Sequence, residues 1–373
     1  MFSCSACDGL NLLTSRERCI RSILHEEPDR IPLILNIRPE PYELLKGALG
    51  TSDDARVREI LGIDVVDAGI GLKGGYLPPG AELKDGPYSS AYTIGERDGF
   101  EIRRDLWGIE SLWAPDHTYT YTYYRHPLQH IPLEEYRWPE TDEGTFSEAQ
   151  MTRRKYEDHC LFGGVSHLWE MAWQIAGFTE IMRMFYTEPQ KADAIIHRLD
   201  KTRLEQAKLL CEAGADVICD GDDVGMQQGM MMSVQVWRRF LRPRYEELAK
   251  LCHDRGAFFF FHSDGWIEPI IPDLIELGVD ILNPIQPECM DPVRLKGLYG
   301  EELCFEGTIG VQSTLPFGRP EDVAEEVKER ISHLGPTGLI LGPTHAMQPD
   351  VSVDNMLSLY RTALKYGWNT GRA

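Results

Sequence analysis

The chain has 373 residues, of which 42% are hydrophobic and 26% are charged, so a large buried core is expected and a disordered chain is not. Its formal net charge of −21 disfavours binding to nucleic acid and to anionic membrane surfaces. Nine scattered cysteines, no signal-peptide pattern and no apolar run of about 18 residues predict a cytoplasmic protein with reduced thiols.

A frayed N-terminus is expected over residues 1–13. Short strands are expected at intervals along the rest of the chain. Eight runs rich in β-branched or aromatic residues predict these strands. They are Ile31–Leu35, Asp64–Val66, Cys160–Val165, Ala215–Cys219, Ala257–Phe261, Val279–Leu282, Leu303–Phe305 and Leu339–Leu341.

Longer stretches that open on Asp, Ser or Pro predict helices between the strands. They are Thr14–Leu24, Pro189–Glu212, Val234–Arg255, Trp266–Leu277, Asp291–Tyr299, Pro320–His333 and Val353–Lys365. The alternation favours an α/β fold, a single (β/α)8 barrel over residues 1–373, with an aromatic-rich antiparallel insertion near residues 73–137. A Rossmann sheet remains open, although no strand is followed by G-x-G-x-x-G.

Polar residues follow nearly every predicted strand. They are Arg38, Asp67, Ser166 and His167, Asp220 with Asp222 and Asp223, His262 with Asp264, Asn283 with Gln286, Glu306, and His345. The loops that follow the strands of such a barrel all open on one face, so these side chains are expected to gather there.

Two histidines stand out among these residues. His262 directly follows four phenylalanines, and His345 lies in the loop after the last apolar strand. Asp264 either points the same way as His262 or caps a helix that begins near Trp266. The three carboxylates of Asp220–Asp223 either lie near a cation, with at least one raised pKa, or form a solvated loop.

Several segments together resemble the uroporphyrinogen decarboxylase superfamily, which includes that haem-pathway enzyme and cobalamin-dependent methyltransferases. They are Arg16–Pro32, Phe162–Gly164, the loop around Asp222, the strand into His262, Phe305–Gly307 and Gly342–Asp350. Their order and spacing cover nearly the whole chain. The resemblance implies an eight-stranded barrel enzyme, which in this superfamily is often a homodimer.

The decarboxylase branch implies a cofactor-free enzyme that grips its substrate with an R-Q-A-G-R motif. Here Arg38 matches the first arginine, but Tyr42 stands at the second and Glu40 adds a negative charge. Asp67 matches the pyrrole-binding aspartate and His345 the C-terminal histidine of that branch. Decarboxylation of a porphyrinogen-like substrate is therefore one alternative function.

The methyltransferase branch implies zinc held by an H-x-C motif and a later cysteine. Here these positions read His262-Ser263-Asp264 and His345, so the resemblance predicts His262, Asp264 and His345 as ligands of zinc, or of iron or manganese. The predicted activity moves a methyl group from a small methylated substrate to a corrinoid protein. A non-catalytic corrinoid-binding or partner subunit is the other alternative.

The predicted site comprises two further groups of residues. The catalytic group is His262, His345, Asp222, Asp67 and Glu306. The substrate-binding group is Arg38, His167, Trp173 and Gln286, because the segment 169–174 and the insertion are expected to shape the pocket.

Overall fold

The computed structural model describes residues 12–86, 89–114 and 121–368. Most of the expected frayed segment, and residues 87–88 and 115–120 of the predicted insertion, therefore lie outside the described residues. No helix in the described ranges is both long enough and apolar enough to cross a membrane. The seven cysteines in the described ranges are free thiols.

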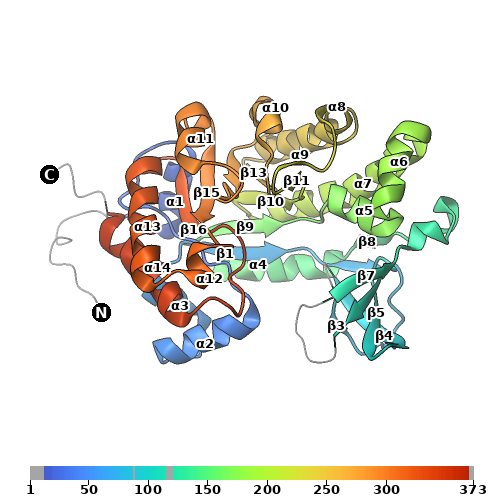
Figure 1. Ribbon diagram of the computed structural model, residues 1–373, viewed down its shortest axis with the longest axis horizontal. Coiled ribbons are helices and arrows are strands. Elements are labelled where there is room, and N and C mark those ends of the chain that lie inside the picture. Colours follow the sequence, from blue (N-terminus) through green and yellow to red (C-terminus); the bar gives the residue numbers. More distant parts are fainter. Residues whose placement is uncertain (1–11, 87–88, 115–120, 369–373) are drawn as a thin grey trace.

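Seven parallel strands form one curled sheet, in which spatial neighbours follow the order of the chain (Figure 1). They are β1 (Val65–Gly69), β9 (Cys160–Gly164), β10 (Val217–Gly221), β13 (Phe258–His262), β14 (Ile281–Asn283), β15 (Cys304–Ile309) and β16 (Leu339–Pro343). Helices connect most successive strands, as parallel strands require. This is an α/β fold consistent with a TIM-type barrel.

The predicted strand Ile31–Leu35 is not a regular strand. Its Leu33 makes a single parallel bridge to Leu341 of β16, and the Leu33 carbonyl accepts a hydrogen bond from the backbone N–H of Asp64 just before β1. Pro32 has no backbone N–H, so a continuous ladder cannot form there. An irregular segment thus lies between the two edge strands, where the eighth strand was expected.

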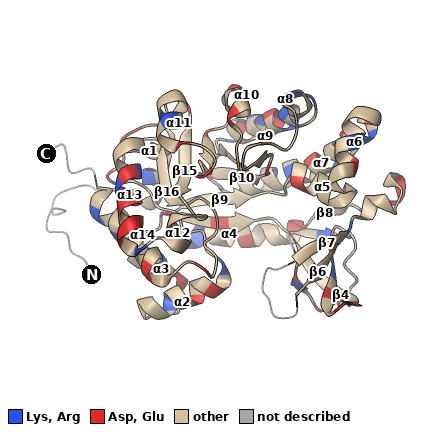
Figure 2. Cartoon of the chain, in the orientation of Figure 1, with Lys and Arg blue, Asp and Glu red and all other residues tan. Residues whose placement is uncertain are grey.

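Helices surround the sheet on its outer side (Figure 1). They are α1 (Ser15–Ile23), α2 (Pro39–Leu49), α3 (Asp54–Leu61), α4 (Phe146–Lys155), α5 (Trp169–Ala176), α6 (Phe178–Thr187), α7 (Pro189–Ala213), α8 (Val234–Val236), α9 (Arg242–Asp254), α10 (Ile271–Leu277), α11 (Pro292–Tyr299), α12 (Thr314–Phe317), α13 (Pro320–Leu334) and α14 (Val353–Tyr366). The sequence analysis predicted no helix at α2 to α6 or at α12. Charged side chains are spread over many of these helices (Figure 2).

Two predicted helices are shorter in the structure than in the prediction, because proline interrupts the backbone hydrogen bonds. The stretch Val234–Arg255 is divided by a π-helical turn over Trp237–Leu241, and α9 begins next to Pro243. The stretch Trp266–Leu277 is irregular at first, followed by a 3-10 turn over Glu268–Ile270 and then by α10.

Residues 84–125 contain a five-stranded antiparallel sheet, which projects to one side of the curled sheet (Figure 1). Its strands are β3 (Lys84–Asp85), β4 (Ser90–Arg97), β5 (Phe100–Asp105), β6 (Glu110–Trp113) and β7 (Tyr121–Arg125). Asp98 and Gly99 join β4 to β5 with φ of 53° and 82°, which a tight hairpin requires. A separate antiparallel pair, β2 (Leu72–Gly74) with β8 (Pro139–Thr141), flanks this sheet in the chain.

The core has two parts. One lies inside the curled sheet and is filled by side chains such as Cys19, Val65, Phe162, Ile281 and Ile340. The other packs the outer face of the sheet against the helices. The carboxyl ends of the strands are thereby left to carry polar side chains.

Candidate active site

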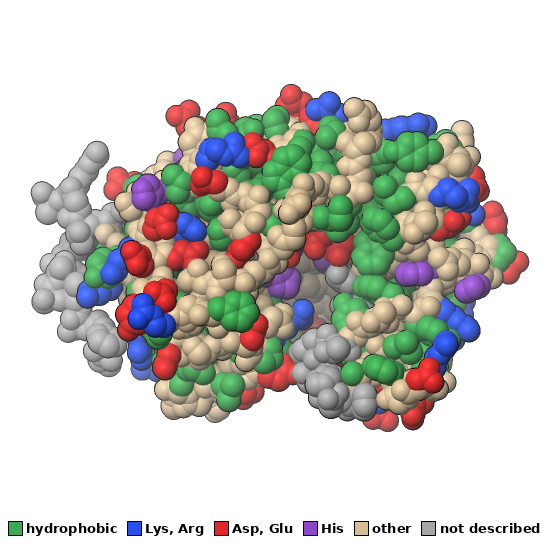
Figure 3. All heavy atoms as spheres, viewed as in Figure 1, with side chains coloured by type: hydrophobic (Ala, Val, Ile, Leu, Met, Phe, Trp, Pro, Cys, Tyr) green, Lys and Arg blue, Asp and Glu red, His purple; other side chains and the backbone are tan. Residues whose placement is uncertain are grey.

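The polar residues predicted after separate strands meet at one end of the sheet. The parallel register pairs Gly221 with His262, and His262 with Asn283, so the ends of β10, β13 and β14 lie at one level. The space-filling view shows a hollow near the middle of the molecule where histidine, acidic and basic side chains gather (Figure 3). This hollow is the mouth that a barrel of this type uses for its active site.

His262 is the centre of the group. Its Nε2 lies 3.4 Å from Asp223 Oδ1 and 3.9 Å from Asp264 Oδ1, while its Nδ1 is hydrogen-bonded to Asn283 Oδ1. Burial alone would lower the pKa of His262, but Asp223, Asp264 and Asn283 together raise it to about 10. The two carboxylates on the Nε2 side therefore favour a positive charge at this place.

Asp264 faces His262 and does not cap a helix. No helix begins at Trp266, and the following 3-10 turn has no side-chain cap. The backbone N–H of Asp264 donates to Asp223 Oδ1 at 2.7 Å, which ties the two loops together. Of the two interpretations that the sequence allowed, the structure shows the one in which Asp264 points toward His262.

Asp223 belongs to the group, although the sequence analysis selected its neighbour Asp222. One ligand atom each from Asp223, His262 and Asp264 lie within 4.8 Å of one another. The signal for Asp223 was the strand register: Gly221 pairs with His262, so Asp223, two residues further on, comes level with Asp264. The side chains of Asp223 and Asp264 are 31% and 34% exposed, so both reach the hollow.

His345 lies beside this group. Its ring centroid is 6.1 Å from that of His262, and the rings are inclined by 54°. Burial lowers the pKa of His345, while the nearby Asp264 acts in the opposite direction. Of the three predicted metal ligands, the structure thus brings His262 and Asp264 together with Asp223, and it places His345 next to that trio but outside it.

The donor chemistry of the group fits a divalent metal ion. It supplies an imidazole nitrogen and two carboxylate oxygens, a set that zinc, iron and manganese all accept. The hydrogen bond from Nδ1 to Asn283 leaves Nε2 directed at the carboxylates, as an outer partner of a metal-binding histidine does.

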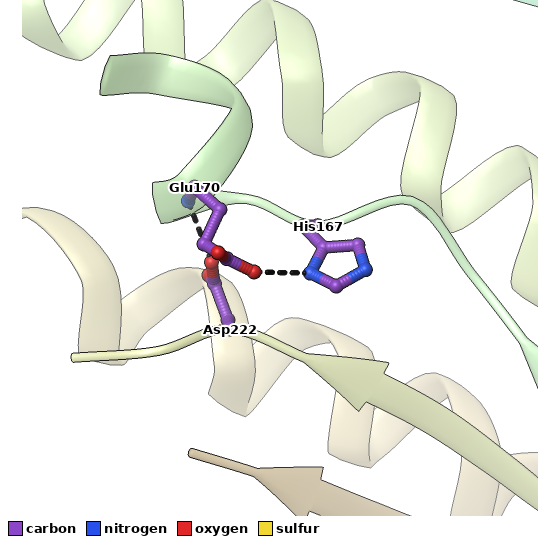
Figure 4. Close-up of side chains that lie close together, drawn as sticks. All are labelled: His167, Glu170 and Asp222. Atoms are coloured by element: carbon purple, nitrogen blue, oxygen red, sulfur yellow. Dashed lines mark hydrogen bonds and ion pairs between the residues drawn. The ribbon is translucent and has the colours of Figure 1, made fainter. Parts of the chain in front are cut away.

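Asp222 serves a different group, with His167 and Glu170 (Figure 4). Its carboxylate is fully buried and accepts hydrogen bonds from the backbone N–H groups of Trp169 and Glu170, at 2.6 and 2.7 Å, and from the Tyr245 hydroxyl. Asp222 therefore caps the N-terminus of α5. Burial, helped by Asp220 and Glu170, raises its pKa to about 7.

The cap sets the position of two residues at the rim of the hollow. His167 Nδ1 lies 2.7 Å from Glu170 Oε2, and the close-up shows the two side chains pointing toward each other (Figure 4). Burial would lower the pKa of His167, but Glu170 raises it overall. The predicted substrate-binding residue His167 is thus paired with a carboxylate.

Two further predicted carboxyl groups lie on the inner side of the sheet. Glu306 is 3% exposed, and burial raises its pKa to about 8. Asp67 is two residues from Val65, which faces the interior of the sheet, so Asp67 points inward as well. Its side chain reaches solvent within the hollow, but the surrounding protein desolvates it and raises its pKa.

Residues 136–366 match the family model described as uroporphyrinogen decarboxylase (URO-D). The chain belongs to the uroporphyrinogen decarboxylase family. The resemblance stated from the sequence is thereby confirmed, although its first segment, Arg16–Pro32, precedes the matched region.

Two similar proteins come from Methanosarcina mazei. The methylated-thiol–coenzyme M methyltransferase is 24% identical over 164 residues, which are 43% of this chain and 42% of that protein. The chain thus spans less than half of the length of that methyltransferase. A solved structure, a methyltransferase, has a TM-score of 0.64 at 17% identity and covers 95% of this chain and 99% of that chain, so it shares the fold.

A more distant solved structure is a B12-independent methionine synthase from Shewanella sp. W3-18-1 in complex with selenomethionine. It has a TM-score of 0.43 at 13% identity and covers 91% of this chain and 95% of that chain.

The remaining predicted substrate residues of this uroporphyrinogen decarboxylase family member occupy different places. Arg38 precedes α2, donates its backbone N–H to Met347, and is close enough to His345 to act on its pKa. Trp173 of α5 meets Tyr123 of the antiparallel sheet edge-on, with ring centroids 5.1 Å apart. Only the tertiary structure shows this contact, which places the insertion beside the mouth.

Gln286 is buried and accepts a hydrogen bond from the backbone N–H of Gly265 at 3.1 Å. Gly265 has a φ of 83°, and a Cβ there would lie 2.7 Å from the Met226 backbone. Gln286 therefore supports the tight turn after His262.

Proposed function

We propose that this protein is a metal-dependent methyltransferase, with zinc as the metal, that moves a methyl group from a small methylated substrate to a corrinoid protein. The observation that carries the proposal is His262 Nε2 facing Asp223 and Asp264 while Asn283 holds Nδ1. The similarity to two methyltransferases of Methanosarcina mazei supports this activity within the family.

The residues of the chain divide into three roles in this proposal. His262, Asp223 and Asp264 would hold the metal, and His345 lies next to them with its ring centroid 6.1 Å from that of His262. Bound zinc supplies Lewis acidity, which makes the heteroatom of a methylated compound a better leaving group. Both carboxylates also balance the positive charge that the ion brings into a partly buried place.

The second role is to receive the substrate. Trp173 offers an aromatic surface at the rim, and Arg38 contributes a positive charge near His345. The pair of His167 and Glu170 lies on the same rim and is held by the Asp222 cap on α5.

The third role is to manage protons within the hollow. Asp67 and Glu306 both have raised pKa values, so each holds a proton more readily than an ordinary carboxyl group. A protonated carboxyl group can donate to a substrate oxygen or nitrogen without adding negative charge to the site.

The test combines metal analysis with methyl transfer to free cob(I)alamin. We expect purified protein to bind zinc stoichiometrically and to form methylcobalamin from methanol, a methylated thiol or a methoxyaromatic compound. His262→Ala and Asp223→Asn should lose both properties. The exposed pair His253 and Asp280, joined at 2.8 Å, provides the matched control His253→Ala, which should lose neither.

Three outcomes would overturn the proposal. Wild-type protein without affinity for zinc, iron or manganese would refute the dependence on a metal. Full methyl transfer by His262→Ala would refute the role of His262. Conversion of uroporphyrinogen with release of carbon dioxide would replace methyl transfer by decarboxylation.

A further inference from the structure

A chain of hydrogen bonds extends from His262 away from the two carboxylates and into the interior. Asn283 Oδ1 pairs with His262 Nδ1, and Asn283 Nδ2 donates to Glu306 Oε2. Asn283 and Glu306 are 6% and 3% exposed, so water has little access to either link. His262 and Asn283 are the last residues of β13 and β14, and Glu306 lies within the adjacent strand β15.

Glu306 determines which way the Asn283 amide points. Asn283 Nδ2 also lies 3.3 Å from the Glu306 backbone carbonyl, which is an acceptor whether or not the Glu306 side chain holds a proton. An acceptor pairs only with the NH2 group of an amide, and the carbonyl Oδ1 must then face His262. The Nδ1 of His262 consequently carries the hydrogen, and Nε2 is the nitrogen that faces Asp223.

The backbone around Glu306 is shaped to admit the amide. Gly307 has a φ of 89°, and a Cβ at that position would lie 3.1 Å from Asn283 Nδ2. The next residue, Thr308, has a φ of 83°, which is costly for a β-branched side chain. This unfavourable conformation lies two residues after Glu306, which holds Asn283.

The main chain holds the same alignment. The backbone N–H of Ser263 donates to the Asn283 carbonyl at 2.9 Å, and the N–H of Asp222 donates to the His262 carbonyl at 2.9 Å. His262 is thus fixed through both its backbone and its ring, while its Nε2 remains open to the hollow.

We propose that Asn283 and Glu306 are positioning residues, which together hold the His262 ring so that Nε2 faces Asp223 and Asp264. The proposal rests on the proposed function in taking His262 as a metal ligand, but the hydrogen bonds themselves do not depend on it. Glu306 acts through Asn283, so its effect disappears when Asn283 is absent.

The first test is a double-mutant cycle read by zinc affinity, measured by competition with a chromophoric chelator. Asn283→Leu and Glu306→Leu should each weaken zinc binding by about 10- to 100-fold, the usual effect of removing an outer partner of a ligand. The double variant should be no weaker than Asn283→Leu alone, because the two residues form one unit. Glu306→Gln keeps an acceptor for Asn283 Nδ2 and should restore most of the affinity.

The matched control is Asn355→Leu. Asn355 is also a buried asparagine, and it donates to the backbone carbonyls of Leu315 and Gly318 at 2.8 Å each, outside the site. Its replacement should lower the melting temperature without changing zinc affinity. If Asn283→Leu does not fold, Asn283→Ala replaces it in the cycle.

The second test does not require metal. In metal-free wild-type protein, the ring Nδ1–H of His262 should give an exchange-protected NMR signal, assigned by its absence in His262→Ala. Asn283→Leu and Glu306→Leu should both lose that protection, and Glu306→Gln should keep it.

Two results would refute the positioning role: additive effects of the two leucine variants on zinc affinity, or protection of the ring signal that survives Glu306→Leu. Failure of wild-type protein to bind zinc would instead refute the proposed function. In that case the NMR test alone still decides whether Glu306 and Asn283 hold the ring.

Discussion

Asp64 joins three parts of the barrel that are distant in sequence, and its replacement gives a sharp test of how the sheet is closed. Its carboxylate is fully buried. Oδ1 accepts from Arg18 at 2.6 Å and from Arg30 at 2.9 Å, and Oδ2 accepts from Arg30 at 2.7 Å and from the Leu33 backbone N–H at 2.8 Å. The last of these bonds holds the irregular segment of residues 31–37 against the start of β1.

We expect Asp64→Asn to lower the free energy of unfolding by about 3–5 kcal/mol, the usual cost of removing one member of a buried ion pair. The loss falls mainly on Arg30. Arg18 keeps Asp29, at 2.6 and 2.9 Å, whereas Arg30 keeps only the backbone carbonyls of Ile31 and Gly62 among its contacts in the described residues. A guanidinium that is 7% exposed then lacks a carboxylate partner.

The assay is urea-induced unfolding followed by tryptophan fluorescence. The control is Asp254→Asn, because the pair of Asp254 and Lys250 lies at the surface, where solvent screens it, so the free energy of unfolding should stay nearly unchanged. The double variant Asp64→Leu with Arg30→Met removes both charges and should recover part of the loss. A cost below about 1 kcal/mol for Asp64→Asn would contradict the role of Asp64 in closing the sheet.

Two further predictions concern other buried charges. Arg203 is fully buried between Asp200 and Asp220, so Arg203→Met should cost about 3–5 kcal/mol in the same urea assay, whereas Arg183→Met, which breaks exposed pairs, should change the free energy of unfolding little. Equal costs for the two variants would show that burial does not decide the effect. Burial raises the pKa of Asp105 from 3.8 to about 7, and its Oδ2 has no hydrogen-bond partner. Because the folded-state pKa is raised, the stability that Asp105 contributes is present below pH 3.8 and is lost as the pH rises to about 7. Asp105→Asn should therefore flatten the melting temperature between pH 4 and 7, and parallel curves for the two proteins would argue against this ionisation.

Much of the barrel is readable from the sequence because its signals are local. A strand buried on both faces appears as a short apolar run, and helices begin at Asp, Ser or Pro. The strand predicted over Ala257–Phe261, which is β13 in the structure, shows the first signal, and α13, which begins at Pro320, shows the second. The positions of His262 and His345 after strands also follow from the sequence, because the carboxyl ends of parallel strands share one face.

What the sequence alone determined is therefore the order of the seven parallel strands, many of the helices between them, and the end of the sheet at which the polar residues collect. Only the tertiary structure decided which of them face one another. Asp222 and Asp223 are adjacent and chemically identical, yet one caps α5 and the other faces His262. The contact of Asn283 with Glu306 and that of Trp173 with Tyr123 likewise join residues that are far apart in the chain. The physical reason is that local sequence governs backbone conformation and side-chain periodicity, whereas the register of neighbouring strands and the curl of the sheet set the distances between side chains.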